Sequence, residues 1–318
     1  MFKFMNKNNL IKILVVSLLV TGFSLSGCKK KDEDTMLSSK ISINKKVEED
    51  QIERPDLRAN FEKAKKQNSD TVAWINIPGT TIDYPVVQDL QNRGQGNEDY
   101  YIHRNFEGKQ VAVGKESAIM SDKRNVISPI EKLSRNIIIS GHNVDLNDNP
   151  NGKMFAPIGH FKNLEFSKKT PYIFLTTEDK DLVFEVFASY YSELRFDFCS
   201  PKNSEKEMNV MIKEAKKRSD FTYDDVDING KDNVLTLYTC TYHFGPYRSL
   251  GYYRTKYVVQ AKLLSDDAKL KETANVKINS NKKSVNFSYC AECNKDMTIE
   301  KCANNGGLCD DCKKKLSK

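Results

Sequence analysis

Short runs of β-type residues, separated by turn residues, fill the middle of this chain. Eight such runs follow one another, at 72–75, 82–84, 117–120, 136–139, 172–175, 182–191, 234–239 and 257–264. Turn-forming pairs such as Pro78-Gly79 and Asn229-Gly230 lie between several of them, which is typical of strands joined by tight connections. Eight strands at this spacing predict a mainly β protein built on a closed or nearly closed eight-stranded barrel.

Helical periodicity predicts two helices beside these strands. The first begins at Pro55 and ends near 68–70, with Leu57, Phe61 and Ala64 on one side. The second covers 204–217 and begins with Ser204 and Glu207 at the spacing of a capping box. On its buried side we expect Met208, Val210, Met211 and Ala215.

The first 27 residues have the pattern of an export signal. Three lysines precede the apolar run 13–20, and Leu25-Ser26-Gly27-Cys28 follows, which resembles the lipobox of bacterial lipoproteins. Only 15 uncharged residues, 13–27, are available to span a membrane, fewer than the roughly 20 that a transmembrane helix needs. We therefore favour lipidation at Cys28 over an uncleaved membrane anchor. Both interpretations place the rest of the chain on the extracytoplasmic face of the cell membrane.

The remaining sequence divides by composition. Residues 28–55 are charged, without apolar periodicity, and are predicted to form a tether. Residues 56–265 carry the strands and form the predicted catalytic barrel. Residues 266–288 have the composition of a linker, and 289–318 form a small cysteine-rich tail.

Net charge bears on the possible partners of the protein and not on its predicted fold. The formal charge of +7 comes largely from lysine-rich stretches near both ends, which suit anionic lipid and wall polymers. No block of arginines interleaved with aromatic residues is present, so we do not expect a nucleic-acid partner.

Cys240 is the candidate nucleophile, because it closes the apolar strand run 234–239. A lone cysteine in such a strand is more often a small buried residue, so its surroundings must decide. His142 follows the aliphatic strand 136–139 and the small pair Ser140-Gly141, and should project from a strand end. A nearby histidine can activate a thiol and protonate a leaving amine.

The other three histidines fit this role less well. His243 lies three residues after Cys240, an odd spacing that places the two side chains on opposite faces of an extended chain. His103 and His160 occur in polar, turn-like sequence and are predicted at the surface.

An arginine is the expected third member of the site. Acyl transfer needs donors directed at the oxygen that becomes negative. Arg254 lies at the predicted start of the strand that returns antiparallel to the Cys240 strand, and we predict that it stabilises this oxyanion and the substrate.

Several segments together resemble the class B sortases. Residues 236–240 match the signature Thr-Leu-x-Thr-Cys, and 140–143 are similar to the segment around the sortase histidine. Residues 74–88, 99–103 and 154–155 resemble further class B segments, so that the likeness covers about 56–264. It implies a sortase barrel with a Cys-His-Arg site and no catalytic cofactor. It also implies a cysteine transpeptidase or endopeptidase that cleaves a sorting motif in exported proteins, holds a thioester on Cys240, and passes the acyl group to a peptidoglycan or pilin amine.

The chain departs from this family in two places. Counting five residues back from the small residue Ala261, where the family has its arginine, gives Lys256, and Arg248 is the alternative to Arg254. Lysine lacks the planar fork of arginine. In addition, sortases usually keep a membrane helix, whereas this chain carries the lipobox.

The tail has the spacing of a metal site. Cys290 and Cys293 form one pair, Cys309 and Cys312 form a second, and 15 residues separate the two pairs, as in four-thiolate zinc sites. We favour structural zinc over disulfides, with Cys302 as a further participant left open. Three functions remain: a transpeptidase, a surface binding lipoprotein on the same scaffold with an idle cysteine, and a peptidase that releases its product to water.

Overall fold

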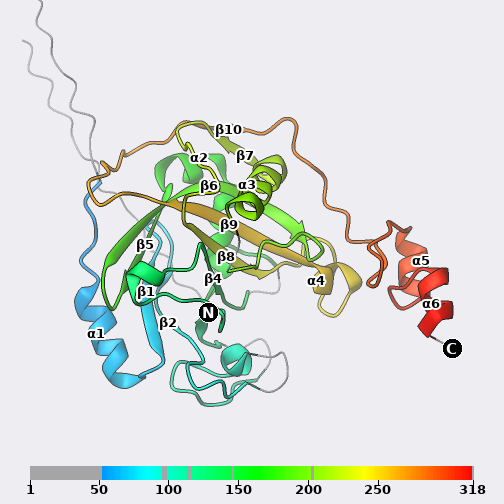
Figure 1. The fold of residues 1–318 in the computed structure, drawn as a ribbon, viewed down its shortest axis with the longest axis horizontal. Helices are drawn as coiled ribbons and strands as arrows, with labels where there is room; N and C mark the ends of the chain where they lie inside the picture. The colour runs from blue at the N-terminus through cyan, green and yellow to red at the C-terminus, as the bar shows by residue number, and fades with distance from the viewer. Residues whose placement is uncertain (1–51, 95–98, 113–115, 145–146, 202–203, 317–318) are drawn as a thin grey trace, which may run out of the picture. The chain divides into compact units, whose positions relative to one another are not determined.

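A closed barrel of eight strands forms the body of the protein, as expected. The computed structural model describes residues 52–94, 99–112, 116–144, 147–201 and 204–316. The barrel order is β1-β2-β3-β4-β8-β9-β6-β5 (Figure 1). Its strands are β1 Thr71–Asn76, β2 Asp83–Val87, β3 Ile119–Ser121, β4 Asn136–Ser140, β5 Tyr172–Thr177, β6 Asp181–Glu193, β8 Val234–Cys240 and β9 Thr255–Leu263.

Burial explains why these runs form strands. β1 alternates between buried and half-buried positions, which reflects one face on the core. β5 is buried along its whole length and β4 along all but its last residue, because other elements cover both faces. Most strand pairs are antiparallel, but β4 runs parallel to β8 and β2 runs parallel to β3. The parallel β4–β8 pair is decisive for the site, because it brings the carboxyl ends of two strands together.

The two predicted helices are present, with small differences. α1 is Arg58–Gln67 and begins after Leu57, so Pro55 lies outside it. α3 is Glu205–Arg218, and the capping box of Ser204 and Glu207 is formed. The prediction for Val210 was wrong, because this side chain is 63% exposed and Ile212 takes the buried position.

Short helices occur between the strands and in the tail. They are the 3₁₀ helices η1 Tyr100–His103, η2 Ile130–Lys132 and η3 Ala156–Lys162, and the α-helices α2 Leu164–Lys169, α4 Leu250–Arg254, α5 Ile299–Asn304 and α6 Asp310–Leu316. α4 occupies the loop between β8 and β9, where the sequence predicted only an early start of β9. Arg254 therefore ends a helix instead of opening a strand.

The segment expected to be a linker carries a strand of its own. β10, Val276–Ile278, pairs antiparallel with β7, Phe221–Tyr223. Leu270 is buried in a small cluster with Leu57 and Tyr172. This part of the chain is therefore held against the barrel, and its polar composition reflects the outer side of a two-stranded ribbon.

The predicted signal, the lipidation site Cys28 and most of the tether lie outside the described residues. Within the described part of the chain, none of the helices combines the length and the apolar character needed to cross a membrane.

Candidate active site

Two neighbouring strand ends bring Cys240 and His142 to one edge of the barrel. β4 and β8 are parallel, and Ser140 lies opposite Tyr238. Two residues further along, the same register reaches His142 on one chain segment and Cys240 on the other. The Asn143 side-chain amide donates to the Cys240 carbonyl at 3.1 Å, and the Thr239 hydroxyl donates to the Gly141 carbonyl at 2.7 Å. Side chains of neighbouring residues thus join the segment that carries the predicted nucleophile to the segment that carries the predicted acid–base.

Gly141 is required here for space. A Cβ atom at this position would lie 2.5 Å from Ile119 Cδ1 and 2.9 Å from Phe155 Cγ. Both of these side chains are buried in the core, so neither can give way at little cost. The glycine therefore lets the segment before His142 pass close to the core.

The His142 ring is half-buried and has one fixed partner. Its Nε2 lies 2.7 Å from the carbonyl oxygen of Ile102 in η1. Since a carbonyl only accepts, Nε2 carries a proton, and Nδ1 is the basic nitrogen of the neutral ring. His103, expected at the surface, is half-buried with its ring 6.4 Å from that of His142.

The remaining histidines have other surroundings. His160 stacks on Phe166 at 5.1 Å, and burial lowers its pKa. His243 is exposed and stacks on Tyr191 at 4.6 Å.

Asp148 holds the segments on both sides of the site, and the sequence analysis missed it. Its carboxylate accepts from the Asn143 amide at 2.8 Å, the Thr241 hydroxyl at 2.6 Å and the Tyr242 backbone N–H at 3.0 Å. These partners immediately follow His142 and Cys240 in the chain. Asp148 lies in an Asn- and Pro-rich turn, so its sequence signal is only that of a turn residue.

Arg254 binds the tail in this structure, and its role at the thiol stays a prediction. Its guanidinium donates to the Phe287 carbonyl at 3.2 Å and to the Tyr289 carbonyl, and lies 4.5 Å from the centroid of the Tyr289 ring. The physical reason is the helix α4, which adds a turn before β9 and changes the direction in which residue 254 points.

The alternative arginine is no better placed. Arg248 is exposed, has a left-handed backbone conformation with φ of 67°, and lies over the ring of Tyr247. The residue directly opposite Cys240 in the β8–β9 ladder is Lys256.

Two other groups define the chemistry near the thiol. The side chain of Tyr252, in α4, lies next to that of Cys240, and its pKa is raised, first by burial and then by the charge of Cys240. Cys199 is the other described cysteine of the barrel, and burial raises its pKa strongly. Cys199 is therefore a poor nucleophile, and Cys240 remains the candidate nucleophile.

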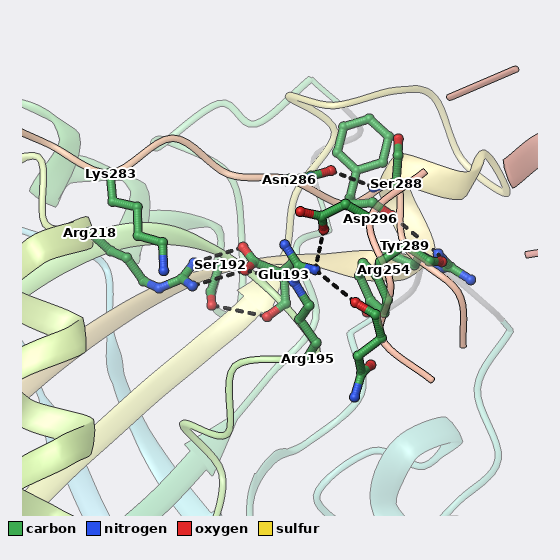
Figure 2. A network of polar contacts seen from close by, with 12 residues as sticks. Ser192, Glu193, Arg195, Arg218, Arg254, Lys283, Asn286, Ser288, Tyr289 and Asp296 are labelled. Atoms are coloured by element: carbon green, nitrogen blue, oxygen red, sulfur yellow. Dashed lines mark hydrogen bonds and ion pairs between the residues drawn. The ribbon is translucent and has the colours of Figure 1, made fainter. Parts of the chain in front are cut away.

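The tail contacts the end of the barrel through a polar network. Figure 2 shows Arg218 and Arg195 converging on the buried Glu193 at the end of β6, with Arg218 Nη1 and Glu193 Oε2 2.7 Å apart. Arg195 also pairs with Asp296 of the tail. The guanidinium groups of Arg195 and Arg254 lie 5.0 and 4.5 Å from the ring centroid of Tyr289. Two arginines from outside the tail, Arg195 and Arg254, thus contact residues of the tail.

The four predicted metal ligands of the tail converge. The sulfur atoms of Cys290, Cys293, Cys309 and Cys312 all lie within 4.8 Å of one another, and none of the described cysteines forms a disulfide. Four sulfurs at about 2.3 Å from a tetrahedral zinc ion are about 3.8 Å apart, and Cys293 and Cys309 are 3.7 Å apart. The cluster therefore fits a metal ion. Cys302 is outside it, with its sulfur facing Arg254 and the Tyr289 carbonyl.

Comparison with known proteins agrees with this architecture. The sortase domain family matches residues 75–264. Sortase B of Listeria monocytogenes is 28% identical over 66% of this chain and 76% of its own length, and sortase B of Staphylococcus aureus is 29% identical over 58% and 68%.

Solved structures give the same answer. A mutant form of Clostridium perfringens sortase B superimposes with a TM-score of 0.52 at 33% identity, covering 64% of this chain and 86% of that one. A Staphylococcus aureus sortase B–substrate complex gives 0.53 at 25% identity, over 66% and 87%.

A barrel that holds a thiol and an imidazole at adjoining strand ends defines a cysteine transpeptidase, and the chain belongs to the sortase family. Within that family, its sequence and structural relatives are of class B.

Proposed function

We propose that this protein is a cell-surface transpeptidase that cleaves a sorting motif in exported proteins and transfers the acyl group to an amine of the cell wall or of a pilin. The observation that carries this proposal is the joint position of Cys240 and His142 at the ends of β8 and β4, held by the bond from Asn143 to the Cys240 carbonyl. The family relationship supplies the general reaction, and the nature of the motif and the amine is part of the proposal.

The reaction needs two transfers through one sulfur atom. The Cys240 thiolate attacks the scissile carbonyl, the S–C bond forms, and the C–N bond breaks as His142 gives a proton to the leaving amine. An incoming amine then attacks the thioester and gives a proton to His142. The new C–N bond forms as the S–C bond breaks, and the Cys240 thiolate and protonated His142 are regenerated.

The proposed location follows from the sequence of the leader. The lipobox ending in Cys28 supports a diacylglyceryl anchor on the extracytoplasmic face of the membrane. The lysine-rich ends of the chain would favour contact with anionic lipid and wall polymers. The partners are then exported proteins with a C-terminal motif, and an amine acceptor at the wall.

For the tail we propose a structural zinc ion held by Cys290, Cys293, Cys309 and Cys312. The distances between their sulfurs support it, and so does the small size of the module, which is too short to build a core. The metal would contribute folding energy only, since the tail carries none of the residues that act at Cys240.

The test is formation of the thioester. Full-length protein in detergent is incubated with a library of sorting-signal peptides, and intact-mass spectrometry is used to look for an acyl adduct that is lost in Cys240→Ala. Amine nucleophiles are then added and the ratio of aminolysis to hydrolysis is measured. A lack of any Cys240-dependent adduct would contradict the enzyme and leave the surface binding protein. Release to water that amines do not change would identify a peptidase.

A further inference from the structure

Among the contacts of the described residues, neither candidate arginine reaches Cys240. Arg254 is bound to the carbonyl groups and the aromatic ring of the tail, and Arg248 is exposed in the loop. An acyl-transfer site still needs donors for the carbonyl oxygen that becomes negative. The question is which groups of this chain face the Cys240 sulfur instead.

Lys256 is one of these groups. It is the direct partner of Cys240 in the antiparallel β8–β9 ladder, so the two side chains leave the same face of the sheet. Cβ atoms of directly opposed residues in such a ladder are about 5 Å apart. The lysine is half-buried, and its Nζ lies 5.9 Å from the centroid of the Tyr252 ring. Its ammonium group therefore lies near the Tyr252 ring, on the face of the sheet that carries Cys240.

Tyr252 is the second group. Its side chain lies next to that of Cys240, and its ring packs against Tyr242 and Tyr247, each with centroids 5.2 Å away. Burial and the neighbouring sulfur raise its pKa, so it keeps its proton at neutral pH. A phenol that keeps its proton is a hydrogen-bond donor.

The helix α4 is locked in the position that presents Tyr252. The Ser249 hydroxyl accepts from the Tyr252 backbone N–H at 3.2 Å and caps the helix. A Cβ on Gly251 would lie 2.0 Å from the Phe244 carbonyl, so the helix can approach this loop only with glycine there. The Thr255 hydroxyl donates to the Gly251 carbonyl at 2.6 Å and fixes the other end.

We propose that Tyr252 and Lys256 together replace the catalytic arginine, with the tyrosine hydroxyl and the lysine ammonium donating to the oxygen of the tetrahedral intermediate at Cys240. This inference rests on the proposed acyl transfer. It assigns to two side chains, from a helix and a strand, the two donors that one planar guanidinium would supply. Arg254 is then not needed at Cys240 and can bind the carbonyl groups of Phe287 and Tyr289.

Two probes separate oxyanion stabilisation from a merely structural role. Acylation by p-nitrophenyl acetate passes through a tetrahedral oxyanion, whereas alkylation by iodoacetamide needs the thiolate but no oxyanion. Both are followed on the full-length protein by site-resolved mass spectrometry at Cys240, across pH 5–9. The variants are Tyr252→Phe, Lys256→Met and Lys256→Arg, with Tyr253→Phe as the matched control because Tyr253 is 54% exposed.

We expect Tyr252→Phe and Lys256→Met each to slow acylation about 100-fold or more, as is known for loss of one oxyanion donor, while alkylation changes less than about threefold. Lys256→Arg, which keeps a cationic donor, should acylate faster than Lys256→Met, and Tyr253→Phe should keep wild-type acylation. Unchanged acylation in Tyr252→Phe and Lys256→Met, or a loss of acylation that alkylation follows in parallel, would overturn the inference. If the wild-type protein shows no acylation beyond that of Cys240→Ala, the proposed function itself fails, and the inference fails with it.

Discussion

Different interactions stabilise the barrel and the cysteine tail. The barrel has a continuous core in which strands from every part of 71–263 bury aliphatic and aromatic side chains. In the described part of the tail, the buried residues of apolar or sulfur type are Tyr289, Cys290, Cys302 and Cys309. Hydrophobic burial is therefore sufficient for the first region and insufficient for the second. One chain thus combines a barrel that has its own core with a small appendage whose contacts centre on four cysteines and two arginines.

Removing metal from the tail should give the largest difference between the two regions. Structural zinc contributes about 10–16 kcal/mol in small zinc modules, so a strong chelator, or Cys290→Ser with Cys309→Ser, should unfold residues after 289. We expect proteolytic cleavage of the tail to become at least tenfold faster, while the melting temperature of the barrel changes little. Metal analysis of protein purified under reducing conditions should find about one zinc per chain.

Cys302→Ser is the matched control, because this buried cysteine is outside the four-sulfur cluster. It should keep the metal. A tail that resists proteolysis equally well without metal, or that contains two disulfides, would contradict this contrast.

A cavity in the barrel should show the opposite pattern. Phe184 in β6 is fully buried, and Phe184→Ala should lower the free energy of unfolding by about 3–5 kcal/mol. Thermal or denaturant unfolding measures this loss, and the zinc content of the tail should remain unchanged. Loss of zinc in this variant would show that the two regions fold as one unit.

Asp148→Asn tests whether the hydrogen bonds of this carboxylate matter more for acylation of Cys240 than for the stability of the barrel. The carboxylate accepts bonds from groups beside both His142 and Cys240, and the amide cannot accept all of them. We expect a loss of stability of about 2 kcal/mol, typical of hydrogen bonds to a charged group, and a fall in Cys240 acylation of about tenfold. Activity that is unaffected while stability falls would remove Asp148 from the site.

Arg254→Ala addresses the contact between the two regions. This variant loses the bonds to the Phe287 and Tyr289 carbonyls and the contact with the Tyr289 ring. We expect about 1 kcal/mol less protection of residues 285–291 in hydrogen exchange, with zinc content retained and Cys240 acylation within about threefold of wild type. Arg248→Ala is the control, since Arg248 is exposed in the loop. A much larger loss of acylation in Arg254→Ala would restore the catalytic role that the sequence suggested.

The smallest effect concerns pH and the barrel alone. Burial, and then the nearby Asp225, raise the pKa of Glu185 from 4.5 to about 7, against smaller opposing effects of Lys271 and Lys262. The folded state thus binds more protons than the unfolded chain between these values, and barrel stability should fall as pH rises from about 4.5 to 7. Glu185→Gln should flatten this decline in a series of thermal melts. An unchanged slope would exclude Glu185 as its cause.

Much of the barrel could be predicted because its strands carry their own signals. β-branched and aromatic runs bounded by turn residues gave the positions of all eight barrel strands, and the Ser204–Glu207 capping box gave the start of α3. Local rules work here because each run buries at least one face. Cys240 and His142 could be chosen because both follow such runs directly.

The parts that could not be predicted depend on contacts between distant segments. α4 is five residues long and is fixed by Ser249, Gly251 and the Phe244 loop, so no periodicity indicates it. Because α4 forms, Arg254 ends a helix and Tyr252 lies next to Cys240. Counting residues along an assumed strand could predict neither position. β10 depends on pairing with β7, about fifty residues away, and Asp148 depends on three partners that only the fold brings together.

The parallel pairing of β4 with β8 has a consequence for when the protein becomes reactive. The bond from Asn143 to the Cys240 carbonyl joins positions 97 residues apart in the chain. Contacts of such long range form late, because the entropy of closing a long loop opposes them until other contacts exist. A newly made chain therefore carries Cys240 as an ordinary thiol, without its imidazole neighbour, until the barrel has closed. The order of assembly thus keeps Cys240 and the segment of His142 apart until the fold is finished.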